Sequence, residues 1–328
     1  MDFDRRYLLA RYPTGGVVVD LESGNYFRVN ASAAAVCDAL RAGSGTAERI
    51  ATELGVSLAE TAAIIADVIS GLATPAVRGE PQGSYHFYPV QGGYVLRHRE
   101  RTVLEINDTE ASISLPTDAE PPEETQLELY VRALAPKLLF QRDVTVLHAS
   151  ACLVARRLIA FAGVSGAGKT TTAHAFAAAG ARLVSEDLVV LAEPAQQADV
   201  LTDAEPFVQS WARETAGELL AGPGRRVSSR SIVGLLDGRK ARLDQILFLD
   251  KTRRANTDFV IAPLEEPEAL LSLMTHDFLG AIDHQAWRRF FEGAVALLKV
   301  VDTKEAAAPD GLDHLVAAAA RYVSRTAS

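Results

Sequence analysis

The pattern of apolar residues near the start of the chain predicts a strand hairpin followed by helices. Residues 16–20 and 26–29 are rich in the β-branched and aromatic residues typical of strands, and the Glu-Ser-Gly-Asn segment between them is typical of a hairpin turn. Beyond Asn30, a favourable N-cap residue, apolar residues recur at helical spacing. The three predicted helices cover residues 31–40, 46–54 and 57–72. A hairpin with three small helices predicts a winged-helix-like α+β module over residues 1–75.

The segment after this module has a different pattern. Residues 73–83 contain proline and glycine and are expected to form a linker. Four short alternating segments then predict β-strands, and residues 127–140 return to helical spacing. The predicted strands are 84–90, 93–98, 101–106 and 111–115. We expect residues 76–145 to be a linker and β-rich segment that leans on the following domain.

The rest of the chain alternates between strand and helix patterns. Residues 158–162 form an apolar run of strand length, and glycines and an alanine-rich helical segment follow it. Three further helical patterns close the chain and are expected to pack on the sheet. They cover residues 264–280, 286–300 and 312–325. This alternation indicates an α/β domain over residues 146–328.

The overall composition and net charge indicate which kinds of binding partner are unfavourable. The chain of 328 residues carries a formal net charge of −9, which argues against a nucleic-acid partner or an anionic membrane surface. It has no run of about eighteen apolar residues that would predict a transmembrane helix, and its first residues do not resemble a signal peptide. Cys37 and Cys152 stand among apolar residues, as buried free thiols in a reducing compartment do. We therefore expect a cytoplasmic protein.

The strongest chemical signal follows the predicted strand at 158–162. The segment Gly-Val-Ser-Gly-Ala-Gly-Lys-Thr matches G-x-x-x-x-G-K-[ST], the phosphate-binding loop. Its glycines let backbone N–H groups converge on phosphates, and the helix N-terminus adds partial positive charge. The lysine reaches the β- and γ-phosphates, and the threonine hydroxyl ligates Mg²⁺. With ATP and Mg²⁺ as the expected cofactors, the predicted binding residues are Gly163, Ser165, Gly166, Ala167, Gly168, Lys169, Thr170 and Thr171.

The N-terminal module carries a resemblance to peptide-binding domains. The segment 17–30, with its Asn-Tyr-Phe-x-Val-Asn core, is followed by Ala-x-Ala-Ala-Val and a Thr…Ile…Leu-Gly-Val run. These motifs resemble the PqqD-like family, whose members recognise ribosomally made precursor peptides. The resemblance implies that a leader peptide adds as a strand to an exposed edge and packs against the third helix. The residues so implied are Asn25, Tyr26, Phe27, Arg28, Val29, Ile65, Val68 and Ile69.

Two other interpretations of this module compete with peptide binding. Winged helices often bind DNA, but residues 31–72 carry only Arg41 and Arg49 as basic residues among several acidic ones. That balance disfavours contacts with phosphates. A purely structural appendage stays open, because a fold alone does not fix a function.

Three elements of the second half carry a more specific resemblance. They are Leu-His-Ala-Ser at 147–150, the glycine loop, and the segment 180–191 with Glu186-Asp187. They resemble the HPr kinase/phosphorylase family, a P-loop kinase core shared with phosphoenolpyruvate carboxykinases. In that family a histidine precedes the glycine loop and an acidic pair follows its helix. His148 and the acidic pair stand at matching distances from Lys169.

The implied chemistry is phosphoryl transfer to a hydroxyl. The metal and Lys169 neutralise charge on the transferring group, and a carboxylate takes the proton from the attacking hydroxyl. By the resemblance, the first acidic position is the base and the second supports metal or substrate. The first is Glu186 here, where the family more usually has aspartate, and a misplaced carboxylate can cost about 10²-fold in rate. We favour Glu186 as the base, keep Asp187 as the alternative base and as a metal ligand beside Thr170, and include His148 among the catalytic residues.

Downstream residues offer candidates for further roles. Residues 222–230 contain glycine, proline and arginine and are typical of an exposed loop. Its arginines are candidates for stabilising the γ-phosphate, with a solvated basic loop as the competing interpretation. They are Arg225, Arg226 and Arg230. Asp250 ends an apolar strand as a Walker-B aspartate does, and a salt-bridged strand end is an equal alternative. The glycine-rich loop associated with phosphorylase activity is not found between residues 192 and 237.

Together these patterns predict a module that binds a precursor peptide, fused to a kinase. Tethering the leader raises the effective concentration of the acceptor hydroxyl at the active site. Two other functions stay open: a nucleotide-dependent regulator that senses peptide without catalysis, and a kinase of a small molecule or carrier protein. The sequence does not identify the acceptor residue, the peptide, the purine preference, the group transferred or whether the chain forms a homo-oligomer.

Overall fold

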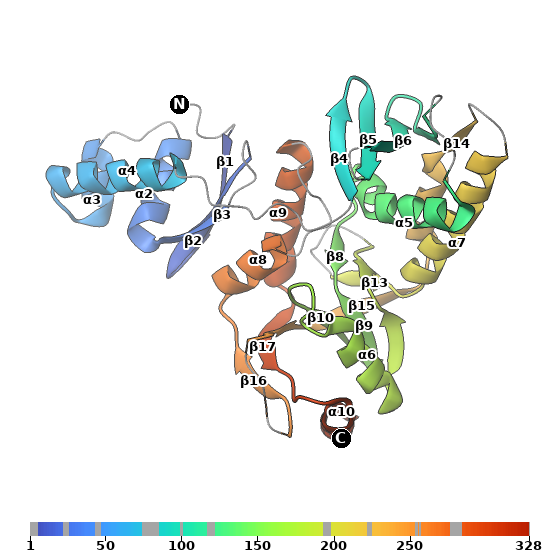
Figure 1. Ribbon diagram of the computed structural model, residues 1–328. Coiled ribbons are helices and arrows are strands. Elements are labelled where there is room, and N and C mark those ends of the chain that lie inside the picture. Colours follow the sequence, from blue (N-terminus) through green and yellow to red (C-terminus); the bar gives the residue numbers. More distant parts are fainter. Residues whose placement is uncertain are drawn as a thin grey trace. The chain divides into compact units, whose positions relative to one another are not determined.

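The computed structural model of the chain (Figure 1) divides into two compact units. The first unit comprises Met1–Gln82 and Glu265–Met274, and the second comprises Gly83–Leu264 and Thr275–Ser328. No helix in the described part of the chain combines the length and the hydropathy that crossing a membrane requires. The residues described are 6–21, 26–42, 47–73, 85–98, 101–116, 122–192, 198–221, 225–252, 255, 257–275 and 284–327.

The first unit is built on a three-stranded antiparallel sheet with the order β1-β2-β3. Its strands are β1 (Tyr7–Tyr12), β2 (Gly15–Asp20) and β3 (Tyr26–Asn30). The predicted hairpin is confirmed as β2 and β3, whereas β1 was not predicted. Among the described strands, β3 lies at one end of this sheet and pairs with β2.

Three helices cover one face of this sheet. They are α2 (Ala31–Arg41), α3 (Ala47–Leu54) and α4 (Leu58–Ala73). As predicted, Asn30 caps α2 by accepting a hydrogen bond from the Ala33 N–H (2.9 Å), while Ser57 and Glu60 form a capping box at α4. The core between sheet and helices includes Tyr7, Leu9, Val18, Val36, Cys37, Ile50 and Val68. Leu58, the first residue of α4, is 52 % exposed.

A fourth helix, α8 (Glu266–Thr275), belongs to the first unit although it lies late in the sequence. Side chains alternate along a strand, so Val17 and Val19 point away from the α2–α4 core, yet both are fully buried. Arg28 of β3 forms an ion pair with Glu268 of α8. The sequence predicted a helix here that packs on the sheet of the second half, whereas the structure groups it with the N-terminal module.

The second unit contains a five-stranded antiparallel sheet with the order β14-β7-β6-β5-β4. The four strands predicted in this region are confirmed. The members are β4 (Tyr85–Val90), β5 (Gly93–His98), β6 (Arg101–Asn107), β7 (Ser112–Ser114) and β14 (Arg226–Ser228). The fifth strand, β14, comes from the arginine-containing segment that the sequence suggested was a loop, and the 3-10 helix η1 (Ser229–Asp237) follows it. Residues 222–224 of that segment lie outside the described residues.

A seven-stranded mixed sheet forms the centre of this unit, with the order β11-β9-β10-β15-β17-β16 and β13 paired to β15. Its strands are β9 (Ser150–Val154), β10 (Arg157–Ala162), β11 (Arg182–Ser185), β13 (Asp199–Leu201), β15 (Lys240–Leu249), β16 (Val260–Pro263) and β17 (Asp302–Ala307). Strands β10, β15 and β17 are parallel, so their carboxyl ends meet at one edge of the sheet. A small antiparallel ladder joins β8 (Val146–His148) to β12 (Leu188–Val190). The predicted α/β class is thereby confirmed.

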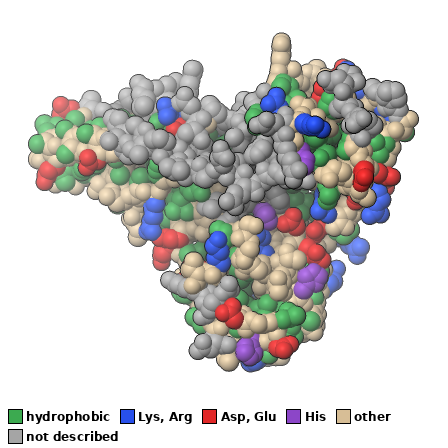
Figure 2. Space-filling view, viewed as in Figure 1, with side chains coloured by type: hydrophobic (Ala, Val, Ile, Leu, Met, Phe, Trp, Pro, Cys, Tyr) green, Lys and Arg blue, Asp and Glu red, His purple; other side chains and the backbone are tan. Residues whose placement is uncertain are grey.

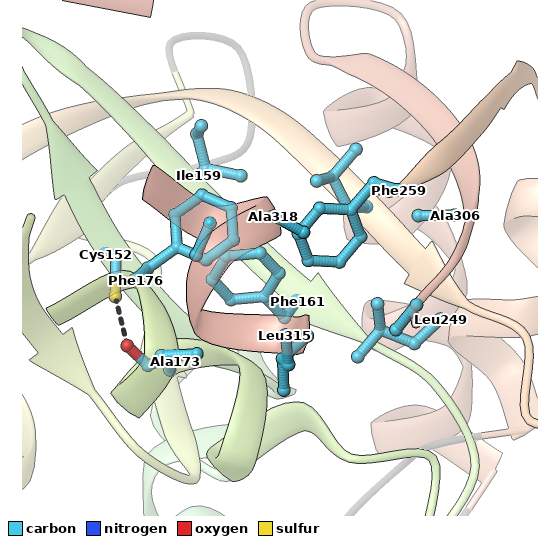
Figure 3. Packing of buried hydrophobic residues seen from close by; sticks show 14 of the residues in the cluster. Cys152, Ile159, Phe161, Ala173, Phe176, Leu249, Phe259, Ala306, Leu315 and Ala318 are labelled. Atoms are coloured by element: carbon cyan, nitrogen blue, oxygen red, sulfur yellow. Dashed lines mark hydrogen bonds between the residues drawn. The ribbon is translucent and has the colours of Figure 1, made fainter. Parts of the chain in front are cut away.

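Helices pack on both the central sheet and one another. They are α5 (Glu124–Phe140), α6 (Lys169–Ala178), α7 (Ala204–Leu220), α9 (His284–Leu298) and α10 (Leu312–Ala327). Helices α6 and α10 pack together over β9, while α5 packs against α7. The rings of Phe161 on β10 and Phe176 on α6 lie 4.9 Å apart at the centre of this core, and the Cys152 thiol donates a hydrogen bond to the Ala173 carbonyl (Figure 3). This packing holds the start of α6 at the carboxyl end of β10.

The grouping of α8 with the first unit can be tested with Leu270→Ala. Leu270 is fully buried, and truncating a buried leucine lowers the free energy of unfolding by about 2–5 kcal/mol. We expect this loss to fall on the first unit, so that amide hydrogen exchange measured by mass spectrometry accelerates in β1–β3 while β10 and β15 keep their protection. The matched control is Leu312→Ala, because Leu312 is 62 % exposed. Faster exchange in β10 and β15 but not in β1–β3 would contradict this grouping.

Candidate functional site

The glycine loop turns directly from β10 into α6, as the sequence predicted. Gly163 has φ +149°, and a Cβ atom there would lie 2.8 Å from the carbonyl oxygen of Leu249 on the neighbouring strand β15. Gly168 is the N-cap of α6 with φ +92°. A side chain would be strained at both positions. The motif glycines are therefore required by the backbone geometry that brings the loop close to the sheet edge.

The remaining loop residues differ in exposure. Ala167 is buried, and its N–H donates a hydrogen bond to the Val164 carbonyl (3.0 Å). The exposed residues are Ser165, Gly166, Thr170 and Thr171. Both threonines lie in the first turn of α6, where backbone N–H groups lack helical partners and the helix dipole favours negative charge.

Lys169 is the first residue of α6 and is 7 % exposed. Its Nζ donates a hydrogen bond to the carbonyl of Gly163 (3.0 Å), so its direct partner is neutral. Burial lowers the pKa of Lys169, and the charge of Asp187 raises it. A buried ammonium without a carboxylate in contact is costly. A phosphate held by the loop would supply the missing negative charge.

The acidic pair lies at a break between two ladders. Strand β9 pairs with β11 up to Ala151 and Ser185, and β8 pairs with β12 from His148 and Leu188 onward. Glu186 and Asp187 lie between these paired positions and join neither ladder. Their side chains are thereby released from sheet packing at the same place where β8 brings in a histidine.

His148 and Asp187 contact each other across this break. Their Nε2 and Oδ1 atoms lie 3.0 Å apart, because His148 is the ladder partner of the residue after Asp187. The hydrogen bond from His148 lowers the pKa of Asp187, burial opposes that shift, and the charges of Lys169 and Arg132 lower the pKa further. The structure thus brings together three of the predicted catalytic residues.

Glu186 is held differently. Its carboxylate lies 3.1 Å from Nε2 of His174 on α6, and its carbonyl accepts hydrogen bonds from the hydroxyls of Ser150 and Thr170. Its N–H donates to the carboxylate of Glu205. The backbone groups of Glu186 that the ladder leaves unpaired are thus satisfied by side chains.

Glu205, in the first turn of α7, positions the acidic pair. One carboxylate oxygen accepts hydrogen bonds from the Glu186 N–H and from the Ser185 hydroxyl (3.0 Å). Ser185 in turn accepts from the Leu188 N–H (3.0 Å). Sequence reasoning did not identify Glu205, because an acidic residue at a helix start is common and its partners lie about twenty residues away.

The acidic pair faces a cavity of about 460 Å³, a volume typical of small-ligand sites. One wall is formed by Thr170, Glu186, Asp187 and Leu188. Helix α5 contributes Leu129, Arg132, Ala133 and Pro136, and helix α7 contributes Glu205, Val208 and Gln209. No motif marks α5 as part of a site, so sequence reasoning missed Arg132.

The three arginines predicted to stabilise the γ-phosphate do not line this cavity. Arg225 lies 3.6 Å from Glu218, and Arg226 pairs with Glu110. Arg230 is an exposed residue of η1. The pairing of β14 with β7 holds this segment in the five-stranded sheet.

Asp250 lies at the same sheet edge as the glycine loop, since β15 runs parallel to β10. Its Oδ1 accepts hydrogen bonds from the N–H and the hydroxyl of Thr252 (2.7 Å each). Within the described residues, no group of three or more His, Cys, Asp or Glu side chains could hold a metal ion.

In the first unit, the residues predicted to bind a peptide lie mainly on strand β3 and on helix α4. Tyr26, Phe27 and Val29 are partly buried, whereas Arg28 is exposed and pairs with Glu268. Val68 is buried in the α2–α4 core, and Ile65 packs against that core while remaining partly exposed. Asn25 and the side chain of Ile69 lie outside the described residues. The described residues thus combine a strand at the end of the described sheet with partly buried apolar side chains.

The charge distribution bears on the class of partner. Acidic and basic side chains are interspersed over the coloured part of the face in Figure 2, and no continuous basic patch is visible among those residues. A nucleic-acid site would concentrate Lys and Arg on one face.

The pairing of His148 with Asp187 predicts a pH response. A depressed pKa adds stability that is present above the ordinary aspartate range and is lost as the pH falls through the lower folded-state pKa. We expect His148→Ala to raise the pKa of Asp187 toward that ordinary range, because its main hydrogen-bond donor is removed. Titration of the ¹³C-labelled side-chain carboxyl by NMR measures this. His174→Ala is the matched control, since it removes the partner of Glu186, and an equal shift of Asp187 in both variants would contradict the prediction.

No protein-family model matches this chain, and a search of curated proteins finds no significant match. The two resemblances drawn from the sequence motifs therefore remain predictions.

Proposed function

We propose that this chain is an ATP- and Mg²⁺-dependent kinase that phosphorylates a serine or threonine hydroxyl of a ribosomally made precursor peptide. The observation that carries this proposal is a buried Lys169, at the N-terminus of the helix after the glycine loop, that contacts no carboxylate among the described residues. Asp187 with its histidine partner lies nearby and faces a cavity. A site for phosphate beside a carboxylate and an acceptor-sized cavity is what phosphoryl transfer to a hydroxyl requires.

Different residues of the chain would bind the phosphates and the metal ion of the nucleotide. The loop amides and the start of α6 would hold the β- and γ-phosphates, and Lys169 would compensate their charge. The Thr170 hydroxyl, exposed one residue later, would ligate Mg²⁺. Bound Mg²⁺ would neutralise charge that develops on the transferred group.

The surroundings of the two carboxylates favour Asp187 over Glu186 as the general base. Asp187 pairs with His148 and is close enough to Lys169 for each charge to shift the other's pKa. The carboxylate of Glu186 pairs with His174 on α6 instead. A base must reach the proton of the attacking hydroxyl beside the phosphate. We therefore assign the base to Asp187, in place of the preference drawn from the sequence resemblance.

Peptide recognition is assigned to the first unit. Strand β3 ends its sheet among the described strands, and Phe27, Val29 and Ile65 are partly exposed around the α2–α4 core. A leader segment can add to this edge through main-chain hydrogen bonds, while its apolar side chains contact these residues. Binding the leader would raise the effective concentration of the acceptor at the kinase site.

The kinase proposal predicts a gain of one phosphate on a peptide encoded beside this chain, after incubation with ATP and Mg²⁺. We expect Lys169→Ala to abolish the gain and Asp187→Asn to slow it by about 10²–10⁴-fold, the usual contribution of a general base. Glu186→Gln should have a smaller effect. Intact-mass spectrometry over a time course measures all three.

The control for these variants is Lys299→Ala, which removes an exposed lysine on another helix end. A gain of a nucleotide's mass would indicate adenylylation and contradict phosphoryl transfer. If Asp187→Asn keeps full kinase activity and Glu186→Gln loses it, Glu186 rather than Asp187 is the general base. Binding of the peptide without any change of mass would support a regulatory protein instead.

The peptide-binding proposal is tested by Ile65→Ala in α4. Removing a partly buried isoleucine side chain from the peptide surface should weaken binding of the precursor peptide about 5- to 30-fold. Phosphorylation of a leaderless peptide should not change. Fluorescence anisotropy with a labelled precursor measures binding.

Leu58→Ala is the matched control for this experiment. Leu58 lies on the same helix but is 52 % exposed at its first residue. We expect it to leave peptide affinity unchanged. Equal affinities for wild type and Ile65→Ala, with the fold intact by circular dichroism, would contradict leader binding on this surface.

A further inference from the structure

Arg132 stands out among the residues that line the cavity beside the acidic pair. It is an exposed residue of α5. Within the described part of the chain it forms no hydrogen bond or ion pair, and its positive charge helps to lower the pKa of Asp187. An arginine that lines a cavity and forms no direct contact with a protein carboxylate can bind an anion from a ligand.

The carboxylates of the same cavity are already engaged. Asp187 pairs with His148, and Glu186 pairs with His174. Glu205 accepts hydrogen bonds from Glu186 and Ser185. Arg132 is the one positively charged residue among the described residues that line the cavity. It lies on helix α5, on a different wall from Glu186 and Asp187.

The cavity lies on the acceptor side of the site. Its described lining begins at Thr170 and continues through the acidic turn, and none of the loop residues 163–168 belongs to it. Helices α5 and α7 add apolar side chains, including Leu129, which is 43 % exposed. A peptide segment can contact this surface while its hydroxyl points to Asp187.

We propose that Arg132 binds a carboxylate carried by the acceptor segment next to its hydroxyl, so that the enzyme selects acidic acceptor sequences. The proposal rests on the kinase function proposed above. The planar guanidinium can hold a carboxylate through two parallel hydrogen bonds. The carboxylate comes from an Asp or Glu side chain or from the C-terminus of the peptide.

The test uses serine-centred octapeptides with the full-length protein, ATP and Mg²⁺. Each flanking position is compared as Asp and as Asn, and each peptide is made with a C-terminal carboxylate and with a carboxamide. We expect wild type to prefer the matching carboxylate form about 10- to 100-fold through a lower KM. Arg132→Ala should abolish this preference without changing the KM for ATP, and Arg132→Lys should keep part of it.

The matched control is Arg213→Ala. Arg213 is an exposed arginine of α7 that does not line the cavity, and its Nε lies 3.9 Å from Glu128. It should keep the full preference for the carboxylate peptide. A preference that survives in Arg132→Ala overturns the proposal. So does a fall in kcat with an unchanged preference, which would place Arg132 on the transferred phosphate.

A binding measurement separates this proposal from the proposed function. If wild type phosphorylates no peptide, the kinase assignment fails, and fluorescence anisotropy with labelled Asp and Asn octapeptides still tests the subsite. We expect tighter binding of one Asp peptide by wild type and equal binding of both forms by Arg132→Ala. Equal binding of both forms by wild type overturns the carboxylate subsite.

Discussion

The candidate site depends on a break between two short antiparallel ladders. Strands β9 and β11 pair on one side, strands β8 and β12 pair on the other, and Glu186 and Asp187 belong to neither. Because the ladder stops there, two backbone groups of Glu186 need other partners, and Ser150, Thr170 and Glu205 supply them. The two ladders fix the position of the acidic pair, while the break lets its side chains pair with His148 and His174 and line the cavity.

Neighbouring carboxylates acquire different partners through this arrangement. Asp187 lies next to the ladder partner of His148 and within the electrostatic influence of Lys169, whereas Glu186 is directed to His174 on α6. The buried ammonium of Lys169 and the carboxylate of Asp187 therefore interact electrostatically, and a bound phosphate would add negative charge next to Lys169. The extra methylene of Glu186, which made its role uncertain from sequence alone, matters less if Asp187 is the reactive group.

How far the sequence could predict this structure depends on the range of the interactions. Local backbone requirements are visible in sequence, so the glycine loop with Gly163 and Gly168 and the cap at Asn30 were found directly. Arg132 and Glu205 were missed, because they reach the cavity through the packing of α5 against α7, which no local pattern encodes. The grouping of α8 with the N-terminal sheet is a long-range feature of the same kind. The specific kinase fold still rests on motif resemblance.

The position of α8 in the chain has a consequence for how the proposed peptide binding could affect the proposed kinase site. This helix belongs to the first unit, and its Glu268 pairs with Arg28 on the strand expected to receive a leader. In sequence, however, α8 connects β16 with α9, two elements of the second unit. A strand added to β3 would change the surroundings of Arg28, and the covalent connections of α8 lead from there into the second unit. Deleting the N-terminal residues would remove the partners of α8 as well as the proposed peptide site, so single substitutions separate recognition from stability better than truncation does.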